Sequence, residues 1–191
     1  MLTFEQFLQE NPQYYKGTHS YQKDTKFIPI SRNNIQRYEV LGSAGNLQFM
    51  LDPSGSVGYV FDDLDLKSKL HHISPIMHVH LRDSGYKNLP QAHHLRIKKN
   101  YAQQGVATLW YKLYVNNKGP IVSDTQHLEG GKNLWKSFLM HPEEGIEISI
   151  LNLDTQQVTP VTSSDNFDEL EKQIWSEDES KRNIVMLMQK K

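Results

Sequence analysis

Histidine is the residue type with the most evident chemical capacity in this chain, which holds nine histidines and no cysteine. His78 and His80 lie in a stretch that alternates apolar and polar residues, so on a strand both imidazoles would share one face. An imidazole titrates near neutral pH, and we take both as candidate general bases. Two imidazoles on one face can also begin a metal site, but no carboxylate has a spacing that would complete one, so we expect no metal and keep a metal-dependent variant as an alternative. The adjacent pairs His71-His72 and His93-His94 would point opposite ways on a strand.

A second candidate site lies where a short apolar strand runs through a polar loop into a helix. A helix start offers unpaired N–H groups and the positive end of the helix dipole, which suit a pyrophosphate. Gly105 and Ala107 would let phosphates approach the backbone closely, although an ordinary loop with a glycine near the helix start gives the same pattern. The candidate cofactor-binding residues are Leu95, Ile97, Gln103, Gln104, Gly105, Val106, Ala107 and Thr108.

A third candidate follows the next short apolar strand. Asp124 would stand at the end of that strand, where a carboxylate can orient or help deprotonate an amine, together with His127. Ser123 is the neighbouring candidate. The alternative is that Ser123 and Asp124 only form a turn and cap the next helix.

The elements that must position these residues follow from periodicity and turn signals. Hairpin-like strands come first, a strand with the alternating histidines follows, and strands then alternate with amphipathic helices. This order predicts one α+β domain over residues 1–191 with a mixed sheet. The expected strands are Arg37–Leu41, Leu47–Leu51, Val57–Phe61, Ile76–Leu81, Leu95–Ile97, Ile121–Val122, Glu147–Leu153 and Asn183–Met188, and the expected helices are Thr3–Glu10, Val106–Leu113, Gly130–Leu139 and Asp165–Trp175.

Composition excludes several classes of protein. A net charge of -1 gives no general field for nucleic acid or membranes, and the absence of cysteine excludes disulfides and a thiol nucleophile. No apolar run approaches the roughly 20 residues of a membrane span, and the N-terminus lacks the pattern of a signal peptide. We therefore expect a cytoplasmic protein with no membrane partner.

The segment around Gly105 resembles motif A of the GNAT superfamily of N-acetyltransferases, in which a strand precedes Gln/Arg-x-x-Gly-x-Gly/Ala. Ile97 matches the strand residue and Tyr101 the aromatic before the loop, whereas Ala102 stands in the Gln/Arg position. Ser123-Asp124 followed by Gly130-Gly131-x-x-Leu134-Trp135 is similar to a GNAT-like branch common in tailed phages. The resemblance covers about residues 76–138.

This resemblance implies a GNAT-like, mostly antiparallel sheet flanked by helices, and acetyl-CoA or another acyl-CoA as the donor. The pyrophosphate would bind the loop, Leu95 and Ile97 would pair with the pantetheine arm, and the acceptor would be an amine on a small molecule, a protein or a nucleic acid base. Trp135 occupies the place of the tyrosine that often protonates the departing thiolate, and indole cannot act as that acid. Tyr111, Tyr114 and Ser123 could substitute, and so could Asp124 or His127.

The departures at Ala102 and Trp135 support an alternative in which the fold is kept without catalysis, as a phage inhibitor of a host factor or as a packaged internal protein. Residues 1–10 also resemble the opening of many proteins of large tailed phages. In some of these the N-terminal helix is a capsid-targeting tag cut after Leu/Ile-x-Glu, a pattern that Leu8-Gln9-Glu10 matches.

Overall fold

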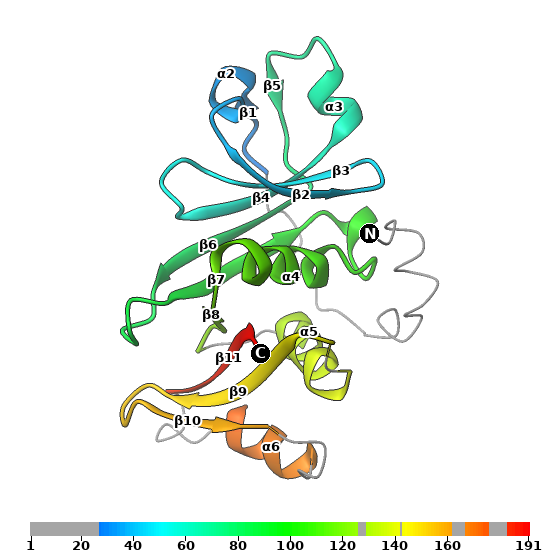
Figure 1. Ribbon diagram of the computed structural model, residues 1–191. Helices are drawn as coiled ribbons and strands as arrows, with labels where there is room; N and C mark the ends of the chain where they lie inside the picture. The colour runs from blue at the N-terminus through cyan, green and yellow to red at the C-terminus, as the bar shows by residue number, and fades with distance from the viewer. Residues whose placement is uncertain (1–26, 126–128, 142, 162–166, 176–182) are drawn as a thin grey trace.

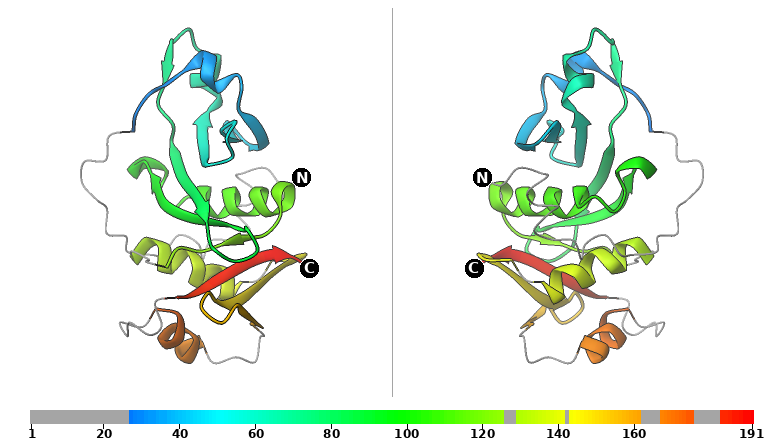
Figure 2. Two further views of the ribbon diagram at one scale, coloured as in Figure 1. Left: turned by 90° about the vertical axis from the view of Figure 1, so that its left-hand side faces the viewer. Right: turned by 90° about the vertical axis from the view of Figure 1, so that its right-hand side faces the viewer.

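We describe the protein from a computed structural model, which defines residues 27–125, 129–141, 143–161, 167–175 and 183–191. The expected helix Thr3–Glu10, with its Leu8-Gln9-Glu10 pattern, lies outside these residues. One curled nine-stranded sheet dominates the fold, in the order β10-β9-β11-β8-β7-β6-β4-β3-β2. Side views show an elongated molecule, with β2, β3 and β4 toward one end, β9, β10 and β11 at the other and α4 between them (Figure 2).

The N-terminal half of the sheet is antiparallel throughout. It consists of β2 (Glu39–Ala44), β3 (Leu47–Leu51), β4 (Val57–Asp62), β6 (Met77–Asp83) and β7 (Pro90–Ile97). A small second layer lies beside it, built from β1 (Ile30–Ser31), α2 (Arg32–Ile35), α3 (Asp63–Lys67) and β5 (His72–Ile73), with β1 and β5 paired (Figure 1).

The C-terminal half is built by alternating strands and helices. After β7 come the 3-10 helix η2 (Lys99–Tyr101), α4 (Val106–Lys118), β8 (Ile121–Val122), α5 (Glu129–Met140), β9 (Ile146–Asn152), β10 (Gln157–Pro160), α6 (Phe167–Ile174) and β11 (Ile184–Lys190). The last strand, β11, inserts between β8 and β9 and is antiparallel to both. The α+β class and the mixed, mostly antiparallel sheet are therefore confirmed.

The junction of the two halves is the feature that positions the site. β7 and β8 are parallel, yet they pair at a single position, Gln91 opposite Val122. β7 then continues to Ile97 while the chain after β8 diverges from it. This leaves the backbone groups of β7 on that side without strand partners in the described part of the chain, and such groups require other partners.

The largest apolar cluster lies between the sheet and its helices. Trp110 and Tyr111 of α4, Trp135 of α5 and Ile174 of α6 all belong to it. The cluster formed by Ile35, Met50, Phe61 and Ile73 under the small second layer, and the one formed by Tyr86, Val122, Leu151, Val185 and Leu187 in the C-terminal half, are separate from it.

Most expected elements match within two or three residues, with two kinds of exception. The strand expected at Leu95–Ile97 begins five residues earlier, at Pro90, and the helix expected at Val106–Leu113 continues five residues further, to Lys118. The short elements β1, α2, α3, β5 and β10 were not expected, because each has too few residues to show a period. Within the described residues, the helices all fall short of the length and apolarity that a bilayer-spanning helix requires.

Candidate functional site

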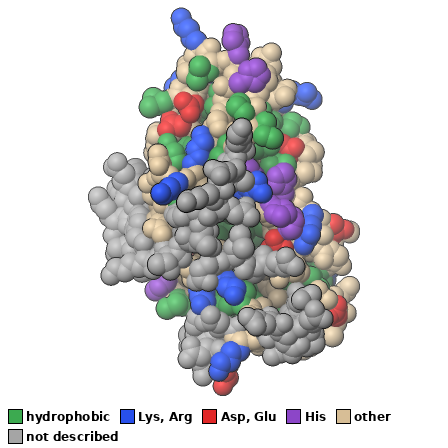
Figure 3. All heavy atoms as spheres, turned by 180° about the vertical axis from the view of Figure 1, so that it is seen from behind, with side chains coloured by type: hydrophobic (Ala, Val, Ile, Leu, Met, Phe, Trp, Pro, Cys, Tyr) green, Lys and Arg blue, Asp and Glu red, His purple; other side chains and the backbone are tan. Residues whose placement is uncertain are grey.

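Polar side chains form a two-by-three grid on the face of β6 and β7 that is turned away from α4. Along β6 the alternate residues His78, His80 and Arg82 share this face, because Met77 and Val79 point into the core. The register on β7 sets Arg96 opposite His78, His93 opposite His80 and Gln91 opposite Arg82. In Figure 1 α4 lies in front of these strands, and the view from behind shows histidines gathered at mid-height beside Lys and Arg side chains (Figure 3).

A bulge in β7 changes the direction of its histidines. The register between β6 and β7 shifts between His78 and His80, and His94 has a φ of 51°. The rings of His93 and His94 consequently lie with their centroids only 3.7 Å apart. The expectation that this pair points opposite ways was therefore wrong, because it assumed a regular pleat and a bulge re-aims the side chains next to it.

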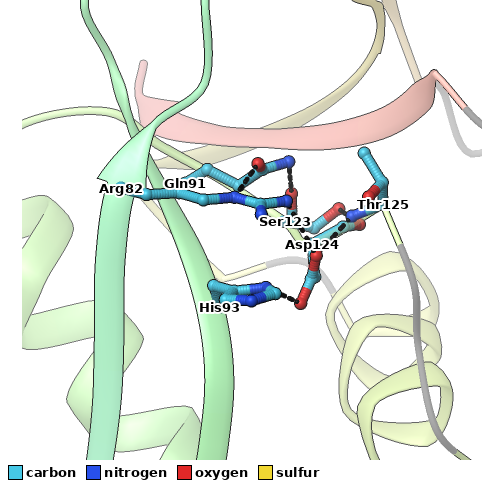
Figure 4. Close-up of polar contacts among 6 residues, drawn as sticks. All are labelled: Arg82, Gln91, His93, Ser123, Asp124 and Thr125. Atoms are coloured by element: carbon cyan, nitrogen blue, oxygen red, sulfur yellow. Dashed lines mark hydrogen bonds and ion pairs between the residues drawn. The ribbon is translucent and has the colours of Figure 1, made fainter.

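His93 and Asp124 face each other across the point where β7 and β8 separate (Figure 4). The Nδ1 atom of His93 lies 2.7 Å from Oδ2 of Asp124. The other oxygen, Oδ1, accepts a hydrogen bond from the backbone N–H of Thr125 at 2.8 Å and lies 3.5 Å from a guanidinium nitrogen of Arg82. An ionised carboxylate only accepts, so neutral His93 carries its proton on Nδ1 and leaves Nε2 as the acceptor.

Ser123 links the segment that carries Asp124 to β11 and to Gln91 of β7 by hydrogen bonds. Its side chain is fully buried, and its Oγ accepts from the backbone N–H of Met186 at 3.0 Å and donates to the carbonyl of Asp124 at 3.2 Å. The Ser123 carbonyl accepts from Nε2 of Gln91 at 2.8 Å, and Oε1 of Gln91 accepts from Arg82. These contacts give Ser123 a positioning role, because they fix the backbone that carries Asp124.

Tyr111 approaches the same carboxylate from the α4 side. It is buried, and burial together with the negative charge of Asp124 raises its pKa far above the ordinary value of 10.0. Its ring packs edge-on against Trp135 at 5.3 Å between centroids. Trp135 is itself only 1% exposed, so this indole is a core residue.

His78 and His80 lie in the grid but apart from the contact between His93 and Asp124. Their rings are 5.5 Å apart, and Phe27 packs edge-on against His78 at 5.3 Å. Burial, followed by the neighbouring His80 and Arg96, lowers the pKa of His78 to about 4. His78 is thus neutral at pH 7, whereas His80 is exposed. The structure brings Asp124 together with His93 instead, and His127 lies outside the described residues.

The candidate cofactor-binding residues lie along β7 and the loop that follows it. Leu95 and Ile97 are half-buried on the strand. Gly105 is the N-cap of α4 with a φ of 72° and makes no side-chain cap, and Gln103 also has a positive φ of 64°. The side chains of Val106 and Thr108, in the first turn of α4, are buried. These two residues can therefore offer a ligand only their backbone N–H groups. Ala107 and Gln104 are partly exposed, and Gln104 donates from its side chain to the carbonyl of Asn100.

Three members of the site were missed by sequence reasoning: Arg82, Gln91 and His93. The strand expected to hold the latter two was placed too late, and the bulge removes the alternation that would have shown it. Among the described residues, no three or more His, Asp or Glu side chains come together in a way that could hold a metal ion.

Comparison with known proteins identifies no family for this chain. No protein-family model matches the chain, and neither curated proteins nor solved structures give a significant match.

Proposed function

We propose that this protein is a GNAT-type N-acyltransferase, which moves an acyl group from acetyl-CoA or another acyl-CoA to an amine. One observation carries the proposal: parallel strands β7 and β8 pair only at Gln91 and Val122 and then separate. The loop leading into α4 lies at the far end of β7, and the pair of His93 and Asp124 lies at the near end. Ile97 lies four residues after His93, which is roughly 13 Å along a strand.

We call the separation between β7 and the chain after β8, beyond Gln91 and Val122, the gap. Several of its features fit an extended acyl-CoA. The edge of β7 around Leu95 and Ile97 has no strand partner among the described residues, and it offers backbone groups for the amides of the pantetheine arm, in the manner of an added strand. The start of α4 offers its first N–H groups to the pyrophosphate, and Gly105 leaves them uncovered. The order of strands, with β11 inserted between β8 and β9, supports the GNAT resemblance of the sequence.

The chain's own groups account for the proton movements. The thioester supplies an activated acyl group. Nε2 of His93 accepts the proton of the attacking amine, and Asp124 holds the imidazole in the tautomer that leaves Nε2 free of a proton. Backbone N–H groups at the bulge of β7 stabilise the negative charge that develops on the acyl oxygen. The same proton then passes from Nε2 of His93 to the departing thiolate, so the thiol leaves protonated and the neutral imidazole is restored.

Calorimetry with acetyl-CoA and with desulfo-CoA tests the proposal. We expect micromolar binding of both by the wild-type chain, and loss of binding in Gly105→Glu, because the new side chain fills the phosphate position with negative charge. Gly55→Glu is the matched control, since Gly55 has the same φ of 72° in a turn with open space around it. Absence of binding to every CoA species by the wild-type chain would refute the proposal.

A binding protein without catalysis is the second candidate, for example an inhibitor of a host factor or a packaged phage protein. The specific support is that Trp135 is buried where related enzymes carry a tyrosine, and that Ala102 replaces the first loop residue of the motif. CoA binding combined with no thiol release across a broad panel of amines would favour this candidate.

A further inference from the structure

The grid on β6 and β7 has an excess of positive and potentially positive groups. His78, His80 and Arg82 on β6 face Arg96, His93 and Gln91 on β7, and His94 adds a further imidazole at the bulge. Among the described residues, the carboxylate that contacts this group is Asp124, which lies against His93 and Arg82 at one end. Arg96 and His78 lie opposite each other at the other end of the grid.

Arg96 lacks a carboxylate partner. In the described part of the chain it makes no ion pair, and its cross-strand neighbour is His78 rather than an acidic residue. Directly opposed side chains in a sheet lie about 5 Å apart, so the neutral His78 ring lies close to the guanidinium of Arg96 without offsetting its charge. Burial is the main cause that lowers the pKa of His78 and of His94, and neighbouring histidines and Arg96 add to it.

The guanidinium of Arg96 is thus a fixed positive charge without a counter-charge among the described residues, and a bound anion would supply one. Arg96 is half-buried, and a guanidinium fork matches the oxygens of a phosphate with two parallel hydrogen bonds. His80 and His94 are exposed beside it and add donors that can rotate toward the remaining oxygens.

We propose that Arg96, with His80 and His94, binds a phosphate group carried by the acceptor, so that the substrate is a small phosphorylated amine. The identification of the ligand as the acceptor rests on the proposed function, whereas the anion site itself rests only on the residues of the grid. The amine would then reach His93, which lies opposite His80 on the neighbouring strand. A small ligand suits a patch of two strands, whereas a nucleic acid backbone needs an extended basic surface that a chain of net charge -1 does not indicate.

Three amines of similar length separate the possibilities: O-phosphoethanolamine, β-alanine and ethanolamine. With acetyl-CoA we expect kcat/KM for O-phosphoethanolamine to exceed that for ethanolamine about 30-fold, in the range of charged hydrogen bonds. In Arg96→Gln the ratio should fall below about 3-fold. Arg37→Gln, which changes an exposed arginine outside the grid, should keep the wild-type ratio. Equal rates for O-phosphoethanolamine and ethanolamine, or a preference for β-alanine, would overturn the phosphate assignment.

A binding measurement without CoA distinguishes failure of this inference from failure of the proposed function. Titration of O-phosphoethanolamine should move the ring signals of His80 and His94 in NMR spectra of the wild-type chain, and the shifts should be lost in Arg96→Gln. Such shifts in a chain that binds no CoA would refute the acyltransferase and keep the anion site. CoA binding without movement of the histidine signals on addition of O-phosphoethanolamine would refute the anion site. Tight binding of a single-stranded oligonucleotide, with no binding of O-phosphoethanolamine, would refute it as well.

Discussion

The two ends of the gap between β7 and β8 differ in the groups that they present, backbone at one end and side chains at the other. The end at α4 consists of backbone, with Gly105 and Gln103 in positive-φ conformations and the first N–H groups of a helix. The end at Gln91 consists of side chains from β6, β7 and the segment after β8, tied by the contacts of Asp124 with His93 and Arg82. In the proposed acyltransferase the first end binds the cofactor and the second moves the protons, so mutations at the two ends should have different effects.

The largest expected effect is on catalysis at the side-chain end. His93→Gln removes the proton acceptor while keeping an amide in its place, and we expect kcat to fall about 10³-fold. The dissociation constant for desulfo-CoA should stay within twofold of wild type, because the binding end is untouched. Steady-state thiol release and calorimetry measure the two quantities, and an unchanged kcat would remove His93 from the mechanism.

The next effect tests whether Ser123 is structural. Ser123→Ala leaves the buried N–H of Met186 without its acceptor, and we expect a loss of about 2 kcal/mol in the free energy of unfolding. Ser43→Ala, at an exposed serine of β2, should change it by less than about 0.5 kcal/mol. Urea denaturation gives both values. A stable Ser123→Ala protein with abolished turnover would instead assign the hydroxyl a direct role in the reaction.

At the binding end, Ala102 offers a gain of function. Ala102 caps η2 and stands where the GNAT motif has Gln or Arg. Ala102→Arg should bring a cation to the pyrophosphate and tighten acetyl-CoA binding about 5- to 10-fold, because the ordering of the long arginine side chain offsets part of a charge-assisted hydrogen bond. Ala102→Gln should give a smaller gain. Calorimetry decides, and weaker binding by both variants would contradict this position for the phosphates.

The smallest effect is a dependence of stability on pH. The pKa of His78 is about 4 in the folded chain against an ordinary 6.5, so the unfolded chain binds more protons between these values. Stability should therefore fall as the pH drops from 6.5 to 4, by about 1 kcal/mol, because the half-exposed ring is partly screened. His78→Gln should flatten this part of the profile. An identical slope in the two proteins would show that other groups cause it.

The sequence predicted the backbone end better than the side-chain end, for a physical reason. The loop and the start of α4 are local, so glycine, small residues and helical periodicity mark them within a dozen positions. His93 and Asp124 are 31 residues apart, and only the parallel register of β7 and β8 brings them together. The shared face of His78 and His80 was predicted because β6 alternates regularly, while the position of His93 was not, because the bulge at His94 breaks the alternation on β7.

The central claim, that an extended acyl-CoA occupies the gap between β7 and β8, is tested most directly by amide hydrogen exchange with and without desulfo-CoA. The account predicts slower exchange at Leu95, Ile97 and the first turn of α4, and unchanged exchange in β2 and β3. Protection confined to β2 and β3, or no protection along β7 at saturating ligand, would contradict it.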